Sequence, residues 1–464
     1  MIVMKFGGTS VEDAGAMRNV VHLVRRERER QMVVVLSAIS GATNALLKSA
    51  HYAVEGKLDE AILLLNELLE RHVTVTENII DDRPTVQQII FSQRKRVEEL
   101  KNLCHGIAIL GELTDRSLDA IASVGELLSS QIVSEAVAAA GLPVRLVDAR
   151  TFMITDDRFG AAAPLFDQIA EKTKAVIRPI LASGTVVVTQ GFIGSTVRGI
   201  TTTLGRGGSD YSASIIGAVL DAEEIQIWTD VDGVLTADPR IAPLARKLKV
   251  ISFREASELA YFGAKVLHPN TILPAVKKDI PVVVLNSRRP DSSGTRIVAA
   301  PPKTMVAVKS IAAKKGITVV NIQSSRMLMA YGFLESIFSV FSRHTTPVDL
   351  VSTSEVAVSL TIDSSAHLPD IVAELERFAE VSIYENKAIL CVVGDQMSTT
   401  AGVADRIFRA LGDISAMMIS QGASEINMSI VIDESQVLPA VQRLHKEFFE
   451  PMPVTDLFEP VAKA

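Results

Sequence analysis

The chain has 464 residues, of which 48% are hydrophobic and 22% charged, and its formal net charge is −7. This length is too great for one ordinary hydrophobic core and predicts at least two domains, and the negative charge argues against a general attraction to nucleic acid or to anionic membranes. The two cysteines, Cys104 and Cys391, are too far apart for a CxxC site, and no apolar run reaches transmembrane length, so we expect a cytoplasmic protein.

Short apolar runs alternate with helical stretches as far as about residue 300. In chain order the pattern predicts a strand at 1–6, a helix at 11–29, a strand at 32–37, helices at 60–70, 86–102 and 118–140, strands at 144–148 and 185–189, a helix at 209–220, a strand at 224–229, a helix at 255–261 and a strand at 282–285. Strands alternating with helices predict a parallel or mostly parallel α/β sheet.

An internal repeat follows Pro301-Pro302, because residues 332–363 line up without gaps on residues 402–433. Each copy follows an alternating strand, and the apolar positions stay in register, as does a Ser-Glu pair, which argues against chance similarity. The pattern predicts two βαββαβ units. We therefore expect a first domain at 1–300 and a second region at 301–464, with repeats at about 313–384 and 385–464 that are either consecutive or interleaved.

Two clusters of small residues end predicted strands. The run KFGGTS places Lys5, Gly7 and Gly8 where backbone amides can approach an anion, although a simple tight turn explains the glycines equally well. The run LSAISGATN places hydroxyl groups, those of Ser37 and Thr43 among them, at the carboxyl end of the second strand, where open α/β sheets bind ligands. Capping of the next helix by Ser40 or Thr43 is the competing interpretation.

The run TTTLGRGGSDY, residues 201–211, is the strongest signal of a ligand site in the chain. It exposes backbone donors at a helix N-terminus, and Arg206 can bind a carboxylate through two parallel hydrogen bonds. Asp210 falls in the first turn of the helix, where capping is its alternative role. A flexible linker would not stand between a strand and an amphipathic helix.

Two further clusters are weaker when each is taken alone. The run WTDVDGV leads a strand into an acidic turn, as where a ribose or a cation is bound, but a plain Asp-Gly turn accounts for it too. The run FGAKVLHP contains Lys265, which could meet phosphates or lie on the surface as an ordinary lysine, and His268, which precedes a proline and is more typical of a structural loop.

Together with SVGELLSS, these strings resemble the aspartokinases of the amino acid kinase superfamily, and the repeat resembles the tandem ACT domains of that family. The resemblance covers nearly the whole chain, and residues 332–363 are most similar to the monofunctional, lysine-sensitive branch. It implies an α/β amino acid kinase fold, with a mainly parallel sheet between helices, followed by two α+β ferredoxin-like ACT domains. It also implies ATP-dependent phosphorylation of the L-aspartate side chain with Mg²⁺, in the first step of lysine, threonine and methionine synthesis, and a homodimer or homotetramer.

The family's pattern implies roles for individual residues. Lys5, with Gly7 and Gly8, would contact the ATP phosphates, and Asp210 would orient Lys5. Leu235 departs from the pattern, because close relatives often have a tyrosine there. The resemblance assigns no protein residue as a metal ligand. It assigns the substrate aspartate to Ser37, Thr43, Glu126, Arg206, Gly207, Gly208 and Ser209, and the nucleotide to Thr229, Asp230, Leu235, Arg240, Lys265 and Val266 as well as to the N-terminal turn.

The residue types suit that reaction. A carboxyl group is ionised at neutral pH, so the attacking oxygen needs no general base, in keeping with the lack of a convincing catalytic His or Cys. The obstacle is repulsion between a carboxylate and a polyphosphate, which Lys5, Arg206, Lys265 and Mg²⁺ can offset. Glu126 can pair with the ammonium of the substrate and Arg206 with its α-carboxylate, which would select an amino acid over a simple dicarboxylate.

The resemblance also implies an amino-acid effector at the first repeat. Asp349 and Glu355 would be the partners of its ammonium groups, although Glu355 could also be a simple turn residue. Lysine is the favoured effector, and threonine stays possible because Ala330 and Pro347 replace serines expected near the ligand. The matching positions are Met327, Gly332, Phe333, Leu334, Val348, Asp349, Ser354, Glu355 and Val356.

Two other functions compete with this interpretation. One is a related kinase that acts on glutamate or acetylglutamate, against which the repeat and the GRGGSD string argue. The other is an amino-acid sensor with an inactive kinase half, against which the intact Lys5, Arg206 and Asp210 argue.

Overall fold

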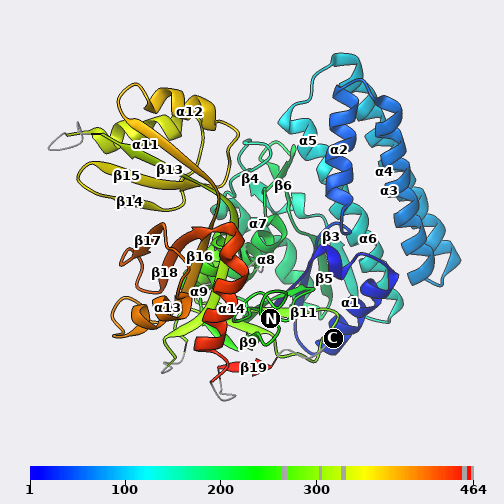
Figure 1. The fold of residues 1–464 in the computed structure, drawn as a ribbon. Helices are drawn as coiled ribbons and strands as arrows, with labels where there is room; N and C mark the ends of the chain where they lie inside the picture. Colours follow the sequence, from blue (N-terminus) through cyan, green and yellow to red (C-terminus); the bar gives the residue numbers. More distant parts are fainter. Residues whose placement is uncertain (264–266, 268, 302–305, 325–330, 452–456, 461–464) are drawn as a thin grey trace. The chain divides into compact units, whose positions relative to one another are not determined.

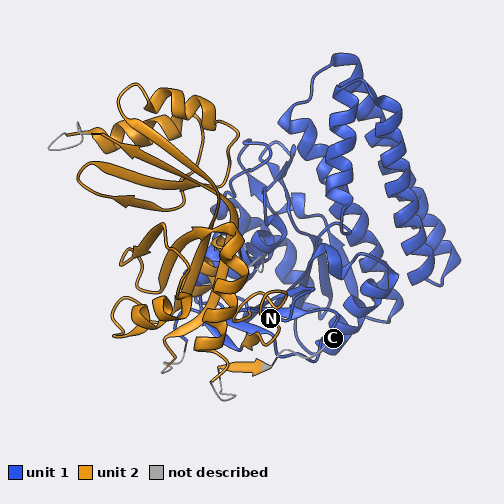
Figure 2. Ribbon diagram, viewed as in Figure 1, with its two compact units in different colours: residues 1–234, 249–253, 266–301 blue, residues 235–248, 254–265, 302–464 orange. Residues whose placement is uncertain are grey.

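The structure is a computed structural model that describes residues 1–263, 267, 269–301, 306–324, 331–451 and 457–460. The chain divides into two compact units (Figure 2). Unit 1 comprises residues 1–234, 249–253 and 266–301, and unit 2 comprises residues 235–248, 254–265 and 302–464. Two segments that precede residue 300 thus group with the C-terminal part, and the expected domain bounds stay a prediction. None of the helices described is both long enough and apolar enough to cross a membrane.

Unit 1 is built on an eight-stranded sheet in the order β10-β12-β11-β8-β1-β2-β5-β3 (Figure 1). All neighbouring strands are parallel except β11 and β12, which confirms the predicted, mainly parallel sheet. The strands are short and rich in β-branched residues, as expected of strands buried on both faces. They are β1 (Ile2–Phe6), β2 (Met32–Leu36), β3 (Val144–Val147), β5 (Val186–Gln190), β8 (Glu224–Thr229), β10 (Val250–Ser252), β11 (Val282–Asn286) and β12 (Thr295–Val298).

Helices cover the sheet, and a helical layer that includes the long pair α3 and α4 packs beside it (Figure 1). One continuous core joins the inner strands to helices α1 to α6. The helices are α1 (Ala14–Arg26), α2 (Ala42–Val54), α3 (Leu58–Ile79), α4 (Arg83–Leu110), α5 (Asp115–Ala122), α6 (Val124–Ala139), α7 (Phe166–Ala182), α8 (Gly208–Leu220) and α10 (Leu273–Lys277).

The single helix predicted at 118–140 is wrong in one respect, because the chain forms α5 and α6, which meet at Ser123. The Ser123 hydroxyl donates to the Ala120 carbonyl at 2.8 Å, a local bond that competes with regular helix geometry. A small sheet of β4 (Ile154–Thr155), β6 (Ile193–Thr196) and β7 (Thr201–Thr203) was not expected from the sequence. It leads directly into α8, so it positions the glycine-rich run between them.

Unit 2 contains a six-stranded antiparallel sheet in the order β14-β15-β13-β16-β18-β17. Its two central strands are long and belong to both repeats. The C-terminal half of β13 pairs with β15 and with the start of β16, whereas its N-terminal half pairs with the end of β16. The start of β16 is thus the fourth strand of the first repeat, and the N-terminal half of β13 is the fourth strand of the second, so the pairing is interleaved. The strands are β13 (Val308–Gln323), β14 (Val351–Thr353), β15 (Ala357–Ile362), β16 (Glu380–Gly394), β17 (Met418–Gln421) and β18 (Asn427–Asp433).

The remaining helices of unit 2 include α11 (Phe333–Arg343) and α12 (Leu368–Leu375), which cover the β13–β15 half around a separate hydrophobic core. The other half carries α13 (Val403–Leu411) and α14 (Val437–Phe448), and α9 (Phe253–Tyr261) and the pair β9 (Arg246–Leu248) and β19 (Phe458–Pro460) complete the unit. The predicted α+β ferredoxin-like repeats are confirmed.

Candidate active site

A cavity of about 700 Å³ lies in unit 1 at the carboxyl ends of β1 and β2. Parallel pairing of Phe6 with Leu36 brings those two ends to the same edge of the sheet, the edge at which open α/β sheets bind ligands. Its lining includes ten residues that the sequence analysis singled out: Lys5, Gly8, Ser37, Thr43, Glu126, Arg206, Gly207, Gly208, Ser209 and Asp210.

The first two turns approach each other closely because glycine stands at their contact. The Ser40 amide donates to the Gly8 carbonyl at 3.1 Å. A Cβ added at Gly8 would lie 3.0 Å from the Ala38 oxygen, and one at Gly7 would lie 3.5 Å from the Lys5 Nζ atom. Gly8 therefore leaves room for the second turn, whereas a side chain at Gly7 would be in ordinary contact with the lysine.

Lys5 forms an ion pair with Asp210, with 2.7 Å between Nζ and Oδ1. Both side chains are mostly buried, with exposed fractions of 11% and 14%. Lys5 comes from β1 and Asp210 from the first turn of α8, so the pair joins the N-terminal strand to the glycine-rich run. This ion pair holds the Lys5 ammonium group at the cavity wall, and the predicted role of Asp210 in orienting Lys5 for the reaction stays a prediction.

Glu126 on α6 is 3% exposed, and its Oε1 accepts a hydrogen bond from the Ala38 amide at 3.1 Å. Its Oε2 has no hydrogen-bond partner among the residues that the structure describes. Burial raises the pKa of Glu126 to about 8, against the opposing effects of the backbone bonds and of Lys5. A buried carboxylate with one free oxygen is a suitable partner for a ligand ammonium group, which would restore its charged form.

Helix α6 can reach the second turn because of Gly125, where a Cβ would lie 2.7 Å from the Ala38 Cβ. The Ser129 hydroxyl adds a bond of 2.8 Å to the Ser37 carbonyl. Glu126 is thus fixed by two neighbours along its own helix.

The run at 204–209 holds Arg206 between two glycines in the left-handed region, Gly205 with φ 75° and Gly207 with φ 71°. A side chain at either position would be strained. Arg206 is exposed and has no carboxylate partner among the described residues, unlike Arg150 nearby in the fold. Helix α8 begins at Gly208 with no side-chain cap. The Gly208 amide donates to the Gly205 carbonyl at 3.0 Å, and the next two amides, those of Ser209 and Asp210, are the ones that an anion could bind.

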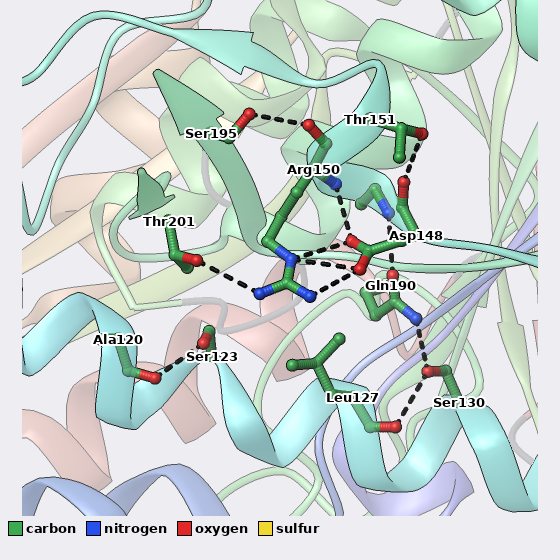
Figure 3. A network of polar contacts seen from close by, with 11 residues as sticks. Ala120, Ser123, Leu127, Ser130, Asp148, Arg150, Thr151, Gln190, Ser195 and Thr201 are labelled. Carbon is green, nitrogen blue, oxygen red and sulfur yellow. Dashed lines mark hydrogen bonds and ion pairs between the residues drawn. The ribbon is translucent and has the colours of Figure 1, made fainter. Parts of the chain in front are cut away.

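A polar network fixes the strand that leads into this run (Figure 3). Arg150 pairs with Asp148 at 2.6 Å and donates to the Thr201 hydroxyl at 3.3 Å. Gln190 at the end of β5 accepts from the Ala149 amide at 2.9 Å and donates to Ser130 on α6 at 2.7 Å. The network ties β5, α6 and the start of β7 together.

The predicted nucleotide residues are less closely assembled. Thr229 is the last residue of β8, the neighbour of β1, and its hydroxyl donates to the next residue, Asp230, at 3.2 Å. Asp232 in the same turn is buried and pairs with Arg289 at 2.6 Å, which is a structural role. Leu235 and Arg240 belong to unit 2, where Arg240 forms a two-point pair with Asp238. Lys265, Val266 and His268 lie outside the described residues.

The predicted effector positions lie in unit 2. Gly332 caps α11 in a left-handed conformation, with Phe333 and Leu334 as its first residues, and Ser354, Glu355 and Val356 are exposed at the β14–β15 turn. Phe333 and Val348 pack against one hydrophobic core. Met327 and Ala330 lie outside the described residues.

Asp349 already has partners from its own chain. Lys314 lies 3.1 Å from Asp349 and 3.0 Å from Asp363, and the Tyr261 hydroxyl donates to Asp349. The Asp349 side chain is only 2% exposed. The Lys314 ammonium lies 4.9 Å from the Tyr261 ring centroid, and burial together with Asp349 raises the pKa of Tyr261.

Sequence reasoning missed further lining residues of the cavity: Asp119, Gly160 and Phe192. The position of Phe192, just after a buried strand and a glycine, is a signal that the sequence contains. Its positive φ of 66° is visible only in the structure. Asp119 had no comparable signal, because an acidic residue inside an amphipathic helix is ordinarily a solvated one.

Comparisons with known proteins agree with the fold. The model of the amino acid kinase family matches residues 1–286, and an ACT domain model matches residues 390–448. Aspartokinase 1, chloroplastic, of Arabidopsis thaliana is 39% identical over 98% of this chain and 81% of its own length. Lysine-sensitive aspartokinase 3 of Escherichia coli is 36% identical over 97% of this chain and 99% of its own.

Solved structures extend this similarity to three dimensions. The crystal structure of E. coli aspartokinase III in complex with aspartate and ADP (R-state) has a TM-score of 0.84 at 35% identity, covering 97% of this chain and 100% of that one. The structure of the same enzyme in complex with lysine and aspartate (T-state) has a TM-score of 0.81 at 36% identity, with the same coverage.

Proposed function

The chain belongs to the aspartokinases of the amino acid kinase family, and from this premise we infer that it transfers the γ-phosphoryl group of ATP to the side-chain carboxylate of L-aspartate. This is the first step in the synthesis of lysine, threonine and methionine. An amino acid, lysine in the first place, inhibits it by feedback.

The observation that carries this function is the arrangement of charges around the cavity. Lys5 with Asp210, the free oxygen of Glu126 and the exposed guanidinium of Arg206 all border one space of about 700 Å³. L-aspartate offers two carboxylates and one ammonium group. We propose that Arg206 binds the α-carboxylate, Glu126 the ammonium group, and that the side-chain carboxylate is directed toward Lys5. The proposed partners with hydrogen-bonding groups are Ser37, Thr43, Gly207, Gly208 and Ser209.

The cavity performs this reaction mainly by position and electrostatics. The attacking carboxylate is ionised at neutral pH, so no residue has to remove a proton from it. Lys5 would offset the negative charge of the phosphates, and the ion pair with Asp210 at 2.7 Å holds its ammonium group in place before the substrates bind. The N-terminus of α8, which has no side-chain cap, adds backbone N–H donors at the wall of the same cavity.

We propose that ATP is held by the turn at Gly7 and Gly8 and by Thr229 and Asp230 at the end of β8. The remaining nucleotide contacts, Leu235, Arg240, Lys265 and Val266, stay predictions. Mg²⁺ would enter with the ATP phosphates, which commonly supply most of its ligands, and would neutralise their charge. The described residues hold no cluster of three or more acidic, His or Cys side chains for a metal ion.

We further propose that the effector binds at the first repeat, with Asp349 and Glu355 near its ammonium groups. Since Lys314 already pairs with Asp349 at 3.1 Å, an incoming ammonium group would have to compete with it or join it. Glu355 at the exposed turn is the more accessible of the two carboxylates. Threonine stays the alternative effector.

The oligomeric state is proposed to be a homodimer or homotetramer formed through the six-stranded sheet. Large apolar side chains are exposed on its strands, and two of them, Val351 and Ile419, lie on the edge strands β14 and β17. Edge strands with exposed apolar residues are prone to pair with another chain. A cytoplasmic location stays a prediction, since the Arabidopsis relative is named chloroplastic.

A coupled assay of ADP release tests the proposed reaction directly. Purified protein with Mg-ATP is expected to turn over with L-aspartate but not with L-glutamate or N-acetylglutamate. The acyl phosphate product can be trapped with hydroxylamine. Turnover with glutamate instead, or binding of aspartate without any turnover, would favour one of the two competing functions.

A further inference from the structure

Asp119 on α5 is a buried carboxylate that borders the cavity, and the mechanism above does not use it. Its side chain is 2% exposed. It accepts hydrogen bonds from the Gly160 amide at 3.0 Å, from the Thr203 amide at 2.9 Å and from the Thr203 hydroxyl at 2.6 Å. Burial raises the pKa of Asp119, and these donors oppose that shift. The ionised form of Asp119 is therefore stabilised by the Gly160 and Thr203 donors.

These bonds join three parts of unit 1 that are far apart in sequence. Asp119 belongs to α5, Gly160 to the loop at 156–163, and Thr203 to the end of β7. The Ala162 amide donates to the Thr203 carbonyl at 2.9 Å, so loop and strand are also bonded to each other. Asp119 anchors both of them to the helical layer.

The anchored groups lie directly beside the run that carries Arg206. Thr203 precedes Arg206 by three residues. A Cβ added at Gly205 would lie 3.3 Å from the Gly160 carbonyl, so the backbone of the run packs on the loop that Asp119 holds. The other end of β7 is fixed separately, through the bond from Arg150 to Thr201 (Figure 3).

We propose that Asp119 is a positioning residue for the substrate: through Thr203 and Gly160 it sets the run at 204–209 so that Arg206 meets the α-carboxylate of aspartate. This inference rests on the proposed function, because it presumes that Arg206 binds this carboxylate. The simpler alternative is that Asp119 only stabilises the fold of unit 1.

The chemistry of the site favours a carboxylate at position 119. Each group that bonds to Asp119 does so as an N–H or O–H donor, and both of its oxygens accept. An asparagine has almost the same volume, but its amide nitrogen could not accept from the Gly160 amide, and the Thr203 hydroxyl would have to turn from donor to acceptor. Asp119→Asn should therefore weaken the anchor of the backbone, through the loss of its charge and of one acceptor, without opening a cavity.

A double-mutant cycle with D119N, R206A and D119N/R206A tests the proposal. We expect D119N to raise the KM for aspartate about 10-fold while the KM for ATP stays within about 2-fold, in keeping with loss of a buried charged hydrogen bond. In the R206A background, D119N should change the KM for aspartate by no more than about 2-fold, because coupled residues are not additive. The matched control is D115N, which makes the same change at an exposed position of the same helix.

Additive effects of the two substitutions would overturn the inference and leave the proposed function intact. So would equal rises in both KM values, the result expected of a purely structural residue. If R206A itself leaves the KM for aspartate unchanged, the proposed substrate contact fails and this inference fails with it.

Should D119N fail to fold, as judged by its thermal unfolding, T203V takes its place. That substitution removes the hydroxyl donor at 2.6 Å but keeps the β-branched shape and the backbone bond. We expect a smaller rise in the KM for aspartate, about 3-fold, again absent in the R206A background. An unchanged KM in T203V would contradict the proposal.

Discussion

The cavity of unit 1 and the surroundings of Asp349 in unit 2 differ in whether their charged side chains already have partners. In the cavity, Glu126 has an oxygen without a partner among the described residues, and Arg206 is exposed. In unit 2, Asp349 is paired with Lys314 and accepts from Tyr261. The first region is arranged to receive a charged ligand, whereas the second already holds an ammonium group of its own. A binding site thus depends on long-range partners as much as on its own residues.

The comparison has an energetic side. Burial raises the pKa of Glu126 to about 8, so the proposed binding of the substrate ammonium group at Glu126 would have to restore the charge of its carboxylate. At Asp349 an effector would meet a carboxylate that Lys314 already stabilises. Its binding free energy would gain only the difference between the effector ammonium group and the Lys314 ammonium group as partners of Asp349. We therefore expect large effects from changes in the cavity and moderate effects from changes around Asp349.

The largest effect is expected from Lys5→Ala. Removal of the ammonium group leaves the phosphates without their nearest fixed positive charge, so kcat should fall about 100-fold or more. Steady-state kinetics at saturating ATP and aspartate measure this. Lys48→Ala, an exposed lysine on α2, is the matched control and should keep full activity. A near-normal kcat for Lys5→Ala would mean that Lys5 takes no part in phosphoryl transfer, which would contradict the proposed role of the cavity.

Arg206→Ala should act on substrate binding rather than on turnover. Loss of a charged, two-point contact is expected to raise the KM for aspartate about 10- to 100-fold, with little change in the KM for ATP. Arg198→Ala, which removes an exposed arginine from the β6–β7 turn, controls for loss of surface charge. If the KM for ATP alone rises, Arg206 belongs to the nucleotide site and the assignment of ligands is wrong.

Glu126→Gln should change how the stability of the protein depends on pH. Since the pKa of Glu126 is raised to about 8, the ligand-free folded state keeps a proton that the unfolded chain loses near 4.5. The free energy of unfolding should therefore fall as pH rises between these values, by up to a few kcal/mol, and Glu126→Gln should abolish that fall. Thermal unfolding of both proteins from about pH 5 to about pH 8 measures it. If the stability of the two proteins changed with pH in the same way, Glu126 would be ionised in the ligand-free protein, which would contradict this prediction.

The aspartate affinity of the wild type should follow the same titration. Binding of the substrate ammonium favours the ionised carboxylate, so the KM for aspartate should decrease as pH rises toward about 8.

The smallest effect is expected from Lys314→Met. Removing the internal competitor for Asp349 should lower the lysine concentration for half-inhibition about 3- to 5-fold, because a partly exposed ion pair contributes about 1 kcal/mol or less. Lys315→Met, an exposed neighbour, is the control. Weaker inhibition in Lys314→Met would mean that Lys314 supports the effector site rather than competing for it.

Much of the fold could be predicted from local patterns. The buried strands β2, β5 and β11 contain continuous apolar runs, and the sheet is mainly parallel as expected. The split between α5 and α6 could not be predicted, because it involves a hydroxyl that bonds to its own helix. The interleaved use of β13 and β16 depends on pairing between strands that are remote in sequence.

The residues of the candidate site also fall into those that local sequence patterns reveal and those that depend on remote partners. Lys5, Arg206 and Asp210 stand out because glycines and a helix start surround them, and the cavity brings them together. The role of Asp119 depends on donors from Gly160 and Thr203, and the pairing of Asp349 depends on Lys314 and Tyr261. Neither set is close in sequence, so no local pattern could reveal it.

The central claim is that one cavity orients L-aspartate by its charges, with Lys5 at the site of transfer. A crystal structure with aspartate and a non-transferable ATP analogue tests it most directly. The account predicts the α-carboxylate on Arg206, the ammonium group on Glu126 and the side-chain carboxylate between Lys5 and the γ-phosphate. Aspartate in the reverse orientation, or a nucleotide bound away from Lys5 and the run at 204–209, would contradict it.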